Sequence, residues 1–525
     1  MSFKTWTLVA TCLGSGIVFL DSTVVTVAMP RIGHDLPATL FGVLEGQSYV
    51  YTGYLLALSA LLILAGALSD HYGRRRVFTI GVAAFGLTSV LCGLAPTMEW
   101  LVAFRLLQGA AGAILVPGSL AILTATFRGE EQGRAFGIWA SASAVTTLLG
   151  PPLGGLLVDT VSWRAAFLIN VPFVIVTLWA TRGYVRESRD ETSSAHFDWL
   201  GAALVALGVG GLSFGAIYGQ QREWRDPEAF VALAVGALAT VAFPFVMARR
   251  RHPLVPLGLF GSRNFAVTNL ATLLIYGALY VFSYFLALFQ QGTLGYTATA
   301  AGLAGVPITV VLVAISPRMG ALAARYGARI FMTAGPALMA LGTLLVARVP
   351  ASSGPWGLRL DDPGTFVPSA GYLVDFMPGL IAFAVGLGIM VAPLTTALMT
   401  SVPKRSAGVG SAVNNAISRI GPQLAGALIF VVITAAFYAS LAQRVPGLDV
   451  SDPAVRQRVT PLNAPKLDAP GAARLYVTED VLRAAREAST EAFRSAMLAC
   501  FALLAAGAAV SWVGIRDADV RAGAE

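Results

Sequence analysis

Charged residues are scarce in this chain of 525 residues: Asp, Glu, Lys and Arg make up 12% of it, and hydrophobic residues make up 56%. Soluble domains carry about 25% charged residues, so the composition excludes an ordinary soluble domain. Cysteine and histidine are also rare, with three and four copies. The cysteines fall in long apolar runs, which argues against a disulfide framework. No histidine falls in such a run, which removes the side chain that most often titrates near neutral pH.

Long apolar runs dominate what remains. A membrane core of about 30 Å is crossed by about 20 helical residues, and the chain contains fourteen runs of roughly that length. They lie at about 6–29, 48–68, 77–95, 99–123, 134–158, 164–181, 199–218, 229–247, 265–289, 298–316, 330–347, 376–400, 407–440 and 492–515. The sequence therefore predicts an all-α membrane protein with 14 transmembrane helices. The first run is too long for a cleavable signal peptide.

Basic residues indicate how the chain is oriented. An even number of spans puts both termini on the same side of the membrane. If the N-terminus is cytoplasmic, the termini and the inner loops together contain 20 Lys and Arg residues, among them Arg74 to Arg76. The short outer loops then carry six. Because positive charge favours the cytoplasmic side, the sequence predicts an integral multi-pass protein of the plasma (cytoplasmic) membrane with both termini in the cytoplasm. The net charge of +8 is explained by this topology rather than by nucleic-acid binding.

Weak internal similarity divides the chain. Gly137 followed by Gly150-Pro151-Pro152-Leu153-Gly154-Gly155 matches Gly408 followed by Gly421-Pro422-Gln423-Leu424-Ala425-Gly426 at a constant offset of 271. Such repeats are typical of membrane proteins built from two related halves. We expect a six-helix domain at 1–190, a two-helix insert and linker at 191–264, and a second six-helix domain at 265–525. The last contains an outer loop at 441–491, in which a short helix should start at Thr478.

Asp21 is the one acidic residue that clearly falls at membrane depth. A charge there costs about 2.5–3.5 kcal/mol and marks a functional site by default, most often for a proton or a cation. Arg105, in the fourth run, is expected at a similar depth in the same half. A nearby cation favours the ionised carboxylate and burial disfavours it, so the pair is suited to proton coupling. The alternative is a permanent structural ion pair.

Two glycine-containing elements are candidates for gating. In the loop Gly66–Arg76, Asp70 could hold the N-terminus of a facing helix while the arginines bridge neighbouring helix ends, which would make a latch between the halves. In the fifth run, Gly150 and Pro151 remove a backbone hydrogen bond and Gly154 and Gly155 permit close helix approach, which favours a hinge and seal between the halves. The alternatives are that the arginines of the loop only set the membrane topology, and that the glycines of the fifth run only allow static packing. The gating candidates are Gly66, Asp70, Gly73, Arg74, Arg75, Gly150, Pro151, Gly154 and Gly155.

Several polar and aromatic side chains are candidates for lining a cavity. Tyr276, Tyr280 and Tyr284 recur every four residues and so share a helix face, and aromatic faces attract cations and flat apolar ligands. Aromatic helix packing explains the same spacing equally well. Asn414 and Asn415 are costly against lipid and should face the protein interior, where they could bind a ligand or a neighbouring helix. The full set of candidates is Tyr54, Tyr276, Tyr280, Tyr284, Gln291, Asn414 and Asn415.

Five motifs resemble a known family. Gly66-x-Leu68-x-Asp70-x-x-Gly73-Arg74-Arg75 resembles the loop signature of the major facilitator superfamily. Leu20 to Val25 with Asp21, Arg105-x-x-Gln108-Gly109, Gly150-Pro151-x-x-Gly154-Gly155 and Trp163-Arg164 with Asn170-Val171-Pro172 are similar to motifs of its fourteen-helix drug/proton antiporter branch. The chain departs from that pattern at Thr146, where a glycine is usual, and at Tyr49, where a tryptophan is usual.

The resemblance implies a function, which we state as an expectation. The protein should be a monomeric, non-enzymatic antiporter that exports amphipathic or aromatic compounds, cations among them, by alternating access. It should need no cofactor or metal beyond the proton gradient and no nucleic acid, and it should confer antibiotic resistance by multidrug efflux. Asp21 would carry the proton and Arg105 would tune it. Alternatives are export of a lipid, siderophore or other natural product, and a membrane receptor or scaffold that transports nothing.

Overall fold

The computed structural model describes residues 3–37, 43–189, 197–221, 224, 226–251, 253–359, 362–403, 406–446, 448–452, 455, 459, 461–462 and 479–517. Within them, 14 helical segments are long and apolar enough to cross a membrane, which confirms the predicted number and the all-α class. The long helices are α1 (Phe3–Asp35), α2 (Val43–Tyr72), α3 (Arg74–Gly93), α4 (Met98–Thr126), α5 (Gly129–Thr160), α7 (Asn170–Tyr184), α8 (Trp199–Gln221), α9 (Pro227–Arg249), α11 (Arg263–Leu288), α13 (Val306–Tyr326), α14 (Ala328–Val346), α15 (Met377–Thr400), α16 (Ala407–Arg444) and α18 (Glu479–Gly514).

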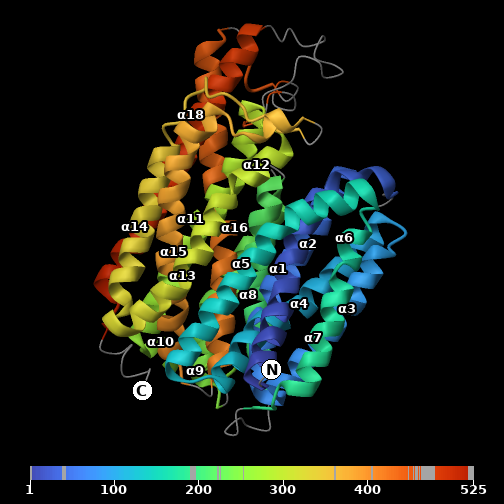
Figure 1. The fold of residues 1–525 in the computed structure, drawn as a ribbon, viewed down its shortest axis with the longest axis vertical. Helices are drawn as coiled ribbons and strands as arrows, with labels where there is room; N and C mark the ends of the chain where they lie inside the picture. Colours follow the sequence, from blue (N-terminus) through green and yellow to red (C-terminus); the bar gives the residue numbers. More distant parts are fainter. Residues whose placement is uncertain are drawn as a thin grey trace.

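Short elements connect or extend these helices. They are α6 (Ala165–Leu168), α10 (Gly258–Gly261), α12 (Ala298–Ala304), a 3₁₀ turn η2 (Pro363–Phe366), and the π-helical turns η1 (Phe289–Leu294) and η3 (Tyr372–Phe376). The helices α1–α7 form one bundle and α11–α18 form a second bundle beside it (Figure 1). The helices α8 and α9 pack on each other, and α8 contacts α2 of the first bundle and α16 of the second. Both termini lie at the same end of the molecule (Figure 1).

The two bundles share a hydrophobic core at the end that holds the termini. There one cluster of buried side chains joins Leu58 and Phe85 of the first bundle to Leu398, Met399 and Val413 of the second. At the opposite end, the cluster of the first bundle is centred on Trp163 and Phe167, and its described members all come from the first bundle. The bundles are therefore sealed together at the terminus end and have separate cores at the other end.

The internal repeat is visible as repeated helix packing. A Cβ on Gly150 of α5 would run into Thr23 of α1, the first helix of the first half. A Cβ on Gly421 of α16 would lie 2.6 Å from the carbonyl oxygen of Leu273 of α11, the first helix of the second half. Each glycine thus permits the same close approach of two backbones, and the sequence offset of 271 corresponds to equivalent helix pairs.

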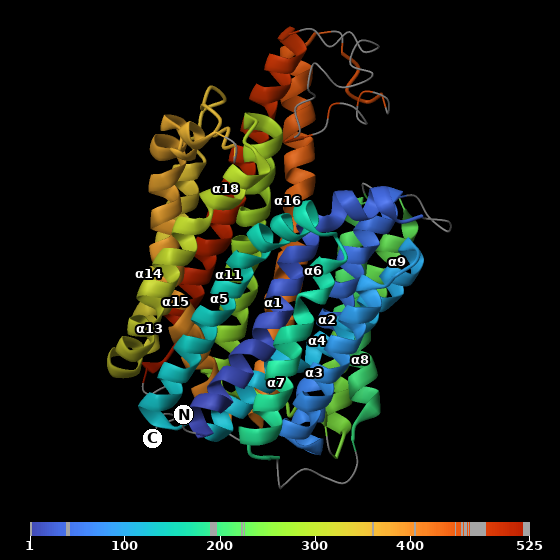
Figure 2. The ribbon, with the colours of Figure 1, turned by 45° about the vertical axis from the view of Figure 1, so that its right-hand side comes forward.

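The helices α16 and α18 are longer than a membrane requires. They contain 38 and 36 residues, which at ~1.5 Å per residue exceeds a core of ~30 Å by about 25 Å, and they project together beyond the bundle (Figure 2). Arg444 of α16 joins them through ion pairs to Glu487 and Glu491 of α18 at 3.0 and 2.7 Å.

The projecting parts of α16 and α18 replace both ends of the outer loop that was expected at 441–491. Its first residues continue α16, and residues from Glu479 onward continue into the last span as one helix rather than forming a separate short one. The physical reason is that the extension buries Ala485, Ala488 and Ala492 against the core of the second half. Thr478 itself lies outside the described residues.

Candidate functional site: a buried carboxylate and its gates

Asp21 and Arg105 meet in the interior of the first bundle. Both side chains are fully buried, Asp21 on α1 and Arg105 on α4. Arg105 Nη1 donates to Asp21 Oδ2 at 2.5 Å, and Arg105 Nε donates to the carbonyl oxygen of Val50 at 3.2 Å. The guanidinium lies over the ring of Tyr54 at 4.0 Å, a cation–π contact. The structure therefore brings together the two charges that the sequence placed at the same depth.

Three neutral polar residues complete this site, and the sequence analysis did not assign them to it. Gln108 Nε2 and Asn170 Nδ2 donate to Asp21 Oδ1 at 3.0 and 2.9 Å. Both amides also donate to Ser89 Oγ, at 2.8 and 3.2 Å. Gln108 Oε1 in turn accepts from Arg105 Nη1 at 2.7 Å. The carboxylate is thus held by an arginine and two amides, all fully buried.

Their positions follow from local structure. Gln108 lies three residues after Arg105 and so on the same face of α4. Asn170 is the first residue of α7, directly after the short helix α6, where the chain bends between two helices. Gln108 and Asn170 stood in motifs that the sequence analysis quoted. Their polarity at membrane depth was a signal that could have assigned them to the site.

Two atoms of this site have no hydrogen-bond partner within the described part of the chain. They are Arg105 Nη2 and Asn170 Oδ1, and both are buried. Buried polar atoms are nearly always paired, so these two mark the part of the site that is incomplete in this conformation.

Asp70 lies where the two bundles are sealed together. Its Oδ1 accepts from Arg74 Nε and Nη2 at 2.9 and 2.8 Å, within the same half. Its Oδ2 accepts from the backbone N–H of Val409, in the first turn of α16, at 3.1 Å. A Cβ on Gly66 would lie 2.7 Å from the carbonyl oxygen of Gly408, so the missing side chain lets α2 approach α16. The acid does hold the N-terminus of a facing helix, as the loop pattern predicted.

Gly73 and Arg75 fix the loop within the first half. Gly73 has φ 106°, which favours glycine, and a Cβ there would lie 2.9 Å from the carboxylate of Glu187. Glu187 accepts from the backbone N–H of Arg75 at 3.0 Å and so caps α3. Arg75 Nη2 donates to the carbonyl oxygen of Arg182 at the end of α7, at 2.7 Å. The arginine bridges neighbouring helix ends as expected.

The second half repeats this cap but not the latch. Gly327 has φ 98°, and Asp517 accepts from the backbone N–H of Arg329 at 3.0 Å at the start of α14. Aligning the two loops on these glycines places Ala324 opposite Asp70. The carboxylate that reaches across to the other half is therefore present in only one of the two repeats.

Gly150 and Gly154 of α5 do not lie between the halves. A Cβ on Gly154 would lie 2.9 Å from the carbonyl oxygen of Val24, so Gly150 and Gly154 both face α1 of the same bundle. Pro151 and Gly155 lie beside them within the uninterrupted helix α5. The expectation of a seal between the halves at this element is wrong, because close packing on α1 uses this face. The two halves are in contact nearer the N-terminus of α5, where a Cβ on Gly137 would lie 3.4 Å from Pro317 Cα of α13.

The tyrosines of α11 face the first bundle. The side chains of Tyr280 and Tyr284 are 49% and 58% exposed. Both nevertheless lie within electrostatic range of Tyr51 of α2, which also interacts with Arg105 and with Arg419 of α16. Both tyrosines therefore lie near α2 of the first bundle. Tyr276 is half-buried, and its ring is tilted by 44° against the ring of Tyr280, with the ring centroids 6.3 Å apart.

Other candidates lie elsewhere. Asn414 is buried and donates to Asn269 Oδ1 and Thr272 Oγ1 of α11 at 3.1 and 2.9 Å, so it bonds a neighbouring helix rather than lining a cavity. Tyr54 is fully buried beneath Arg105 and donates to the carbonyl oxygen of Val18 at 3.3 Å, so it belongs to the carboxylate site. Asn415 is half-buried and donates to Ser411 of its own helix, and Gln291 is exposed in η1.

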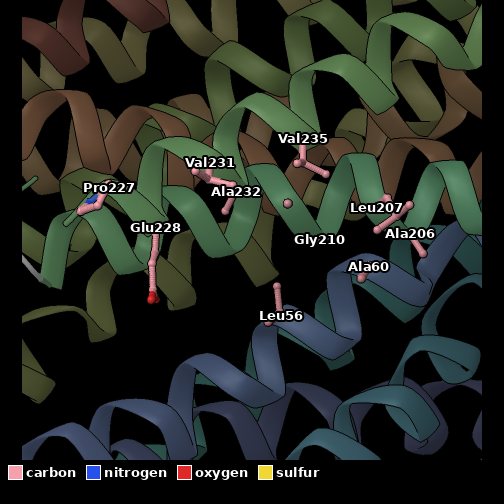
Figure 3. A pocket seen from close by; sticks show the side chains of 11 residues that line it. Leu56, Ala60, Ala206, Leu207, Gly210, Pro227, Glu228, Val231, Ala232 and Val235 are labelled. Atoms are coloured by element: carbon pink, nitrogen blue, oxygen red, sulfur yellow. The ribbon is translucent and has the colours of Figure 1, made fainter.

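A separate apolar cavity of about 570 Å³ lies between α2, α8 and α9 (Figure 3). Leu56 and Ala60 of α2 line one side, and residues of the two insert helices line the other, with Glu228 at the start of α9 as the one charged member. Tyr51, Tyr280 and Tyr284 are not among the residues that line it.

In the part of the chain that the structure describes, twelve long apolar helices in two bundles, two further apolar helices beside them and a buried ion pair define a multi-pass membrane transporter. Residues 11–426 match the sequence model of the Major Facilitator Superfamily. The chain belongs to that superfamily and is not an enzyme. Among the described residues, no three side chains of the usual metal-binding types come together.

Relatives in sequence are export and resistance proteins. The chain is 34% identical over 437 residues to the multidrug resistance protein Stp of Mycobacterium tuberculosis, covering 83% of this chain and 77% of that protein. It is 31% identical over 429 residues to the tetracenomycin C resistance and export protein of Streptomyces glaucescens, covering 81% and 75%. It is 32% identical over 445 residues to the puromycin resistance protein pur8 of Streptomyces alboniger, covering 83% of each chain.

Solved structures share the fold at low sequence identity. The human organic anion transporter MFSD10 matches with a TM-score of 0.59 and 14% identity, covering 96% of this chain and 100% of that one. The proton:xylose symporter XylE matches with a TM-score of 0.59 and 14% identity, covering 100% and 99%. These likenesses concern the fold alone.

Proposed function

We propose that the protein exports amphipathic and aromatic compounds, cations among them, in exchange for protons by alternating access. The observation that carries this proposal is the Asp21 carboxylate, which is fully buried in the interior of the first bundle and paired with Arg105. Such a carboxylate can be ionised while paired, and it takes up a proton when its surroundings change. The export and resistance proteins to which the chain is similar support the direction of transport.

The end at which the two halves are joined indicates the stage of the transport cycle that this conformation represents. Asp70 and the shared core join the halves at the end that holds both termini. With the termini in the cytoplasm, as the distribution of basic residues predicts, this conformation opens outward. In this conformation both carboxylate oxygens of Asp21 accept hydrogen bonds, which is the arrangement expected after a proton has been released.

The cargo is proposed from the aromatic side chains. Tyr280 and Tyr284 are exposed and lie within electrostatic range of Tyr51 of the first bundle, and aromatic ring faces bind flat apolar groups and cations. A natural product made by the cell is the second candidate cargo. It is favoured because one relative is a tetracenomycin C export protein and another, 33% identical over 438 residues, is the cephamycin export protein of Amycolatopsis lactamdurans.

The test is proton release from energised everted vesicles on addition of substrate, with wild type and Asp21→Asn. Asn keeps the size of the side chain but cannot ionise, so the variant should be inserted and folded and should release no protons. Ser22→Ala, next to Asp21 but bonded only to its own helix at Phe19, is the matched control and should behave as wild type. Release by Asp21→Asn at the wild-type level would refute the coupling role of Asp21.

A further inference from the structure

The Asp21 carboxylate meets only hydrogen-bond donors among the side chains described around it. Arg105 donates to Oδ2, and the amides of Gln108 and Asn170 donate to Oδ1. An ionised carboxylate is purely an acceptor, whereas a protonated one carries an O–H donor. This arrangement therefore suits ionised Asp21, and a protonated Asp21 would direct its O–H at another donor.

One acceptor near the carboxylate is unused. Gln108 Oε1 already accepts from Arg105 Nη1 at 2.7 Å and from Cys92 Sγ at 3.5 Å. Ser89 Oγ already accepts from both amides. Asn170 Oδ1, in contrast, is buried and has no partner among the described residues. Rotation of the Asn170 amide about its terminal torsion exchanges this oxygen with the nitrogen that now lies 2.9 Å from Asp21 Oδ1.

Building on the proposed function, we propose that Asn170 is a positioning residue whose side-chain amide reverses when Asp21 gains or loses its proton. With Asp21 ionised, Nδ2 donates to Oδ1, as in this structure. With Asp21 protonated on Oδ1, Asn170 Oδ1 takes the place of Nδ2 and accepts the O–H. The proton comes from solvent and stays on Asp21, and the amide changes orientation without changing charge.

The surroundings allow this exchange. The titratable and charged groups near Asp21 are Arg105 on α4, Cys92 on α3 and Tyr54 on α2, with Tyr51 of α2 and Arg419 of α16 further out. When Asp21 is neutral, Arg105 keeps its bonds to Val50 and Gln108 and its contact with the Tyr54 ring. The hydroxyl of Ser89 can rotate to donate to Asn170 Oδ1 or to accept from Nδ2. Asn170 is therefore the group that can satisfy both states of the acid.

Infrared difference spectroscopy of the full chain, recorded while the pH is lowered, tests this proposal. In wild type we expect a carboxylic-acid C=O band that is absent in Asp21→Asn. With isotope-labelled asparagine we expect an amide band that titrates with the same midpoint and is absent in Asn170→Leu. Thr177→Val is the matched control, because Thr177 is a buried residue of the same helix that bonds only Phe173, and its spectrum should match that of wild type.

The variant Asn170→Leu shows how the carboxylic-acid band should change when the amide is lost. Asn170→Leu removes the donor to the ionised acid and the acceptor for the protonated acid. The acid band should therefore move to the frequency of a less strongly bonded acid.

The outcomes separate this inference from the proposed function. An Asp21 band without any change at Asn170, or an unaltered acid band in Asn170→Leu, would overturn the role of Asn170 and leave Asp21 as the proton carrier. If Asn170→Leu does not fold, the labelled wild-type spectrum decides by itself. A spectrum without an Asp21-dependent band would instead refute proton binding at Asp21, and with it both proposals.

Discussion

The carboxylate of Asp70 accepts a hydrogen bond at 3.1 Å from the backbone N–H of Val409, a residue 339 positions later in the chain. This bond connects the end of α2 in the first half to the first turn of α16 in the second half. It is also an attraction between a negative charge and the positive end of a helix dipole. The same carboxylate holds Arg74, so breaking the contact to α16 leaves it paired rather than stranded. A contact of this kind can open and close repeatedly.

Asp70→Ala should shift the protein toward opening at the terminus end. A charge at a helix N-terminus contributes at most about 2 kcal/mol, so the ratio of closed to open molecules should fall by up to about 30-fold. Spin labels at Tyr72→Cys and Tyr326→Cys, exposed positions at the ends of α2 and α13, should report a longer distance. Glu187→Ala removes a cap within one half and should leave this distance unchanged. An unchanged distance in Asp70→Ala would show that Asp70 is not a latch.

Gly150→Ala should impair folding and transport. The added Cβ would overlap the side chain of Thr23 and press on the backbone of α1, and overpacking of this kind costs about 1–3 kcal/mol. A lower midpoint of thermal unfolding in detergent and slower efflux are expected. Gly133→Ala, on the same helix, has no atom within 4 Å of the new Cβ and should be neutral or slightly stabilising. Equal behaviour of the two variants would argue against close α1–α5 packing.

Tyr280→Ala and Tyr284→Ala should weaken the binding of aromatic cations. Loss of one cation–π contact is worth about 0.5–2 kcal/mol, which corresponds to a rise in Kd of about 2- to 30-fold. Tyr326→Ala removes a tyrosine of similar exposure at the terminus end and should leave Kd unchanged. Fluorescence titration in detergent gives these constants. If the three variants bind alike, the tyrosines of α11 do not contact the substrate.

Asn414→Leu should lower stability without changing the range of substrates. Asn414 bonds Asn269 and Thr272 across two helices, and hydrogen bonds between membrane helices contribute about 0.6 kcal/mol on average. We therefore expect a small decrease in the unfolding midpoint and unchanged Kd values. A change in Kd that differs from one substrate to the next would instead place Asn414 in the binding site.

One proton should be exchanged in each cycle, because Asp21 is the carboxylate proposed to carry it. Export of a neutral substrate then moves one net charge, worth about 2.3 kcal/mol per 100 mV. Export of a monovalent cation moves none. Collapsing the voltage with a potassium ionophore in symmetric potassium should therefore impair neutral efflux and spare cation efflux. Strong inhibition of cation efflux would require a second proton and a second coupling residue.

The sequence by itself determined the class of fold and the chemistry of the centre. The fourteen spans follow from the lengths of the apolar runs, which a membrane of fixed thickness makes easy to recognise. Asp21 and Arg105 were identifiable because charge at membrane depth is costly and therefore rare. The loop from Gly66 to Arg76 predicted a bond from its acid to a helix N-terminus, and the structure places Asp70 against Val409.

Only the tertiary structure decided which neighbours these residues have. Asn170 of α7 donates to Asp21 and also to Ser89 of α3, and no local pattern specifies such contacts, because they depend on how the helices are arranged around each other. The same holds for Gly150 and Gly154 of α5, whose spacing indicates close helix approach but does not identify the partner helix, and the structure shows that this helix is α1. The last span is part of a helix of 36 residues. The residues that precede the span extend this helix, because they pack against an apolar surface that lies beyond the membrane.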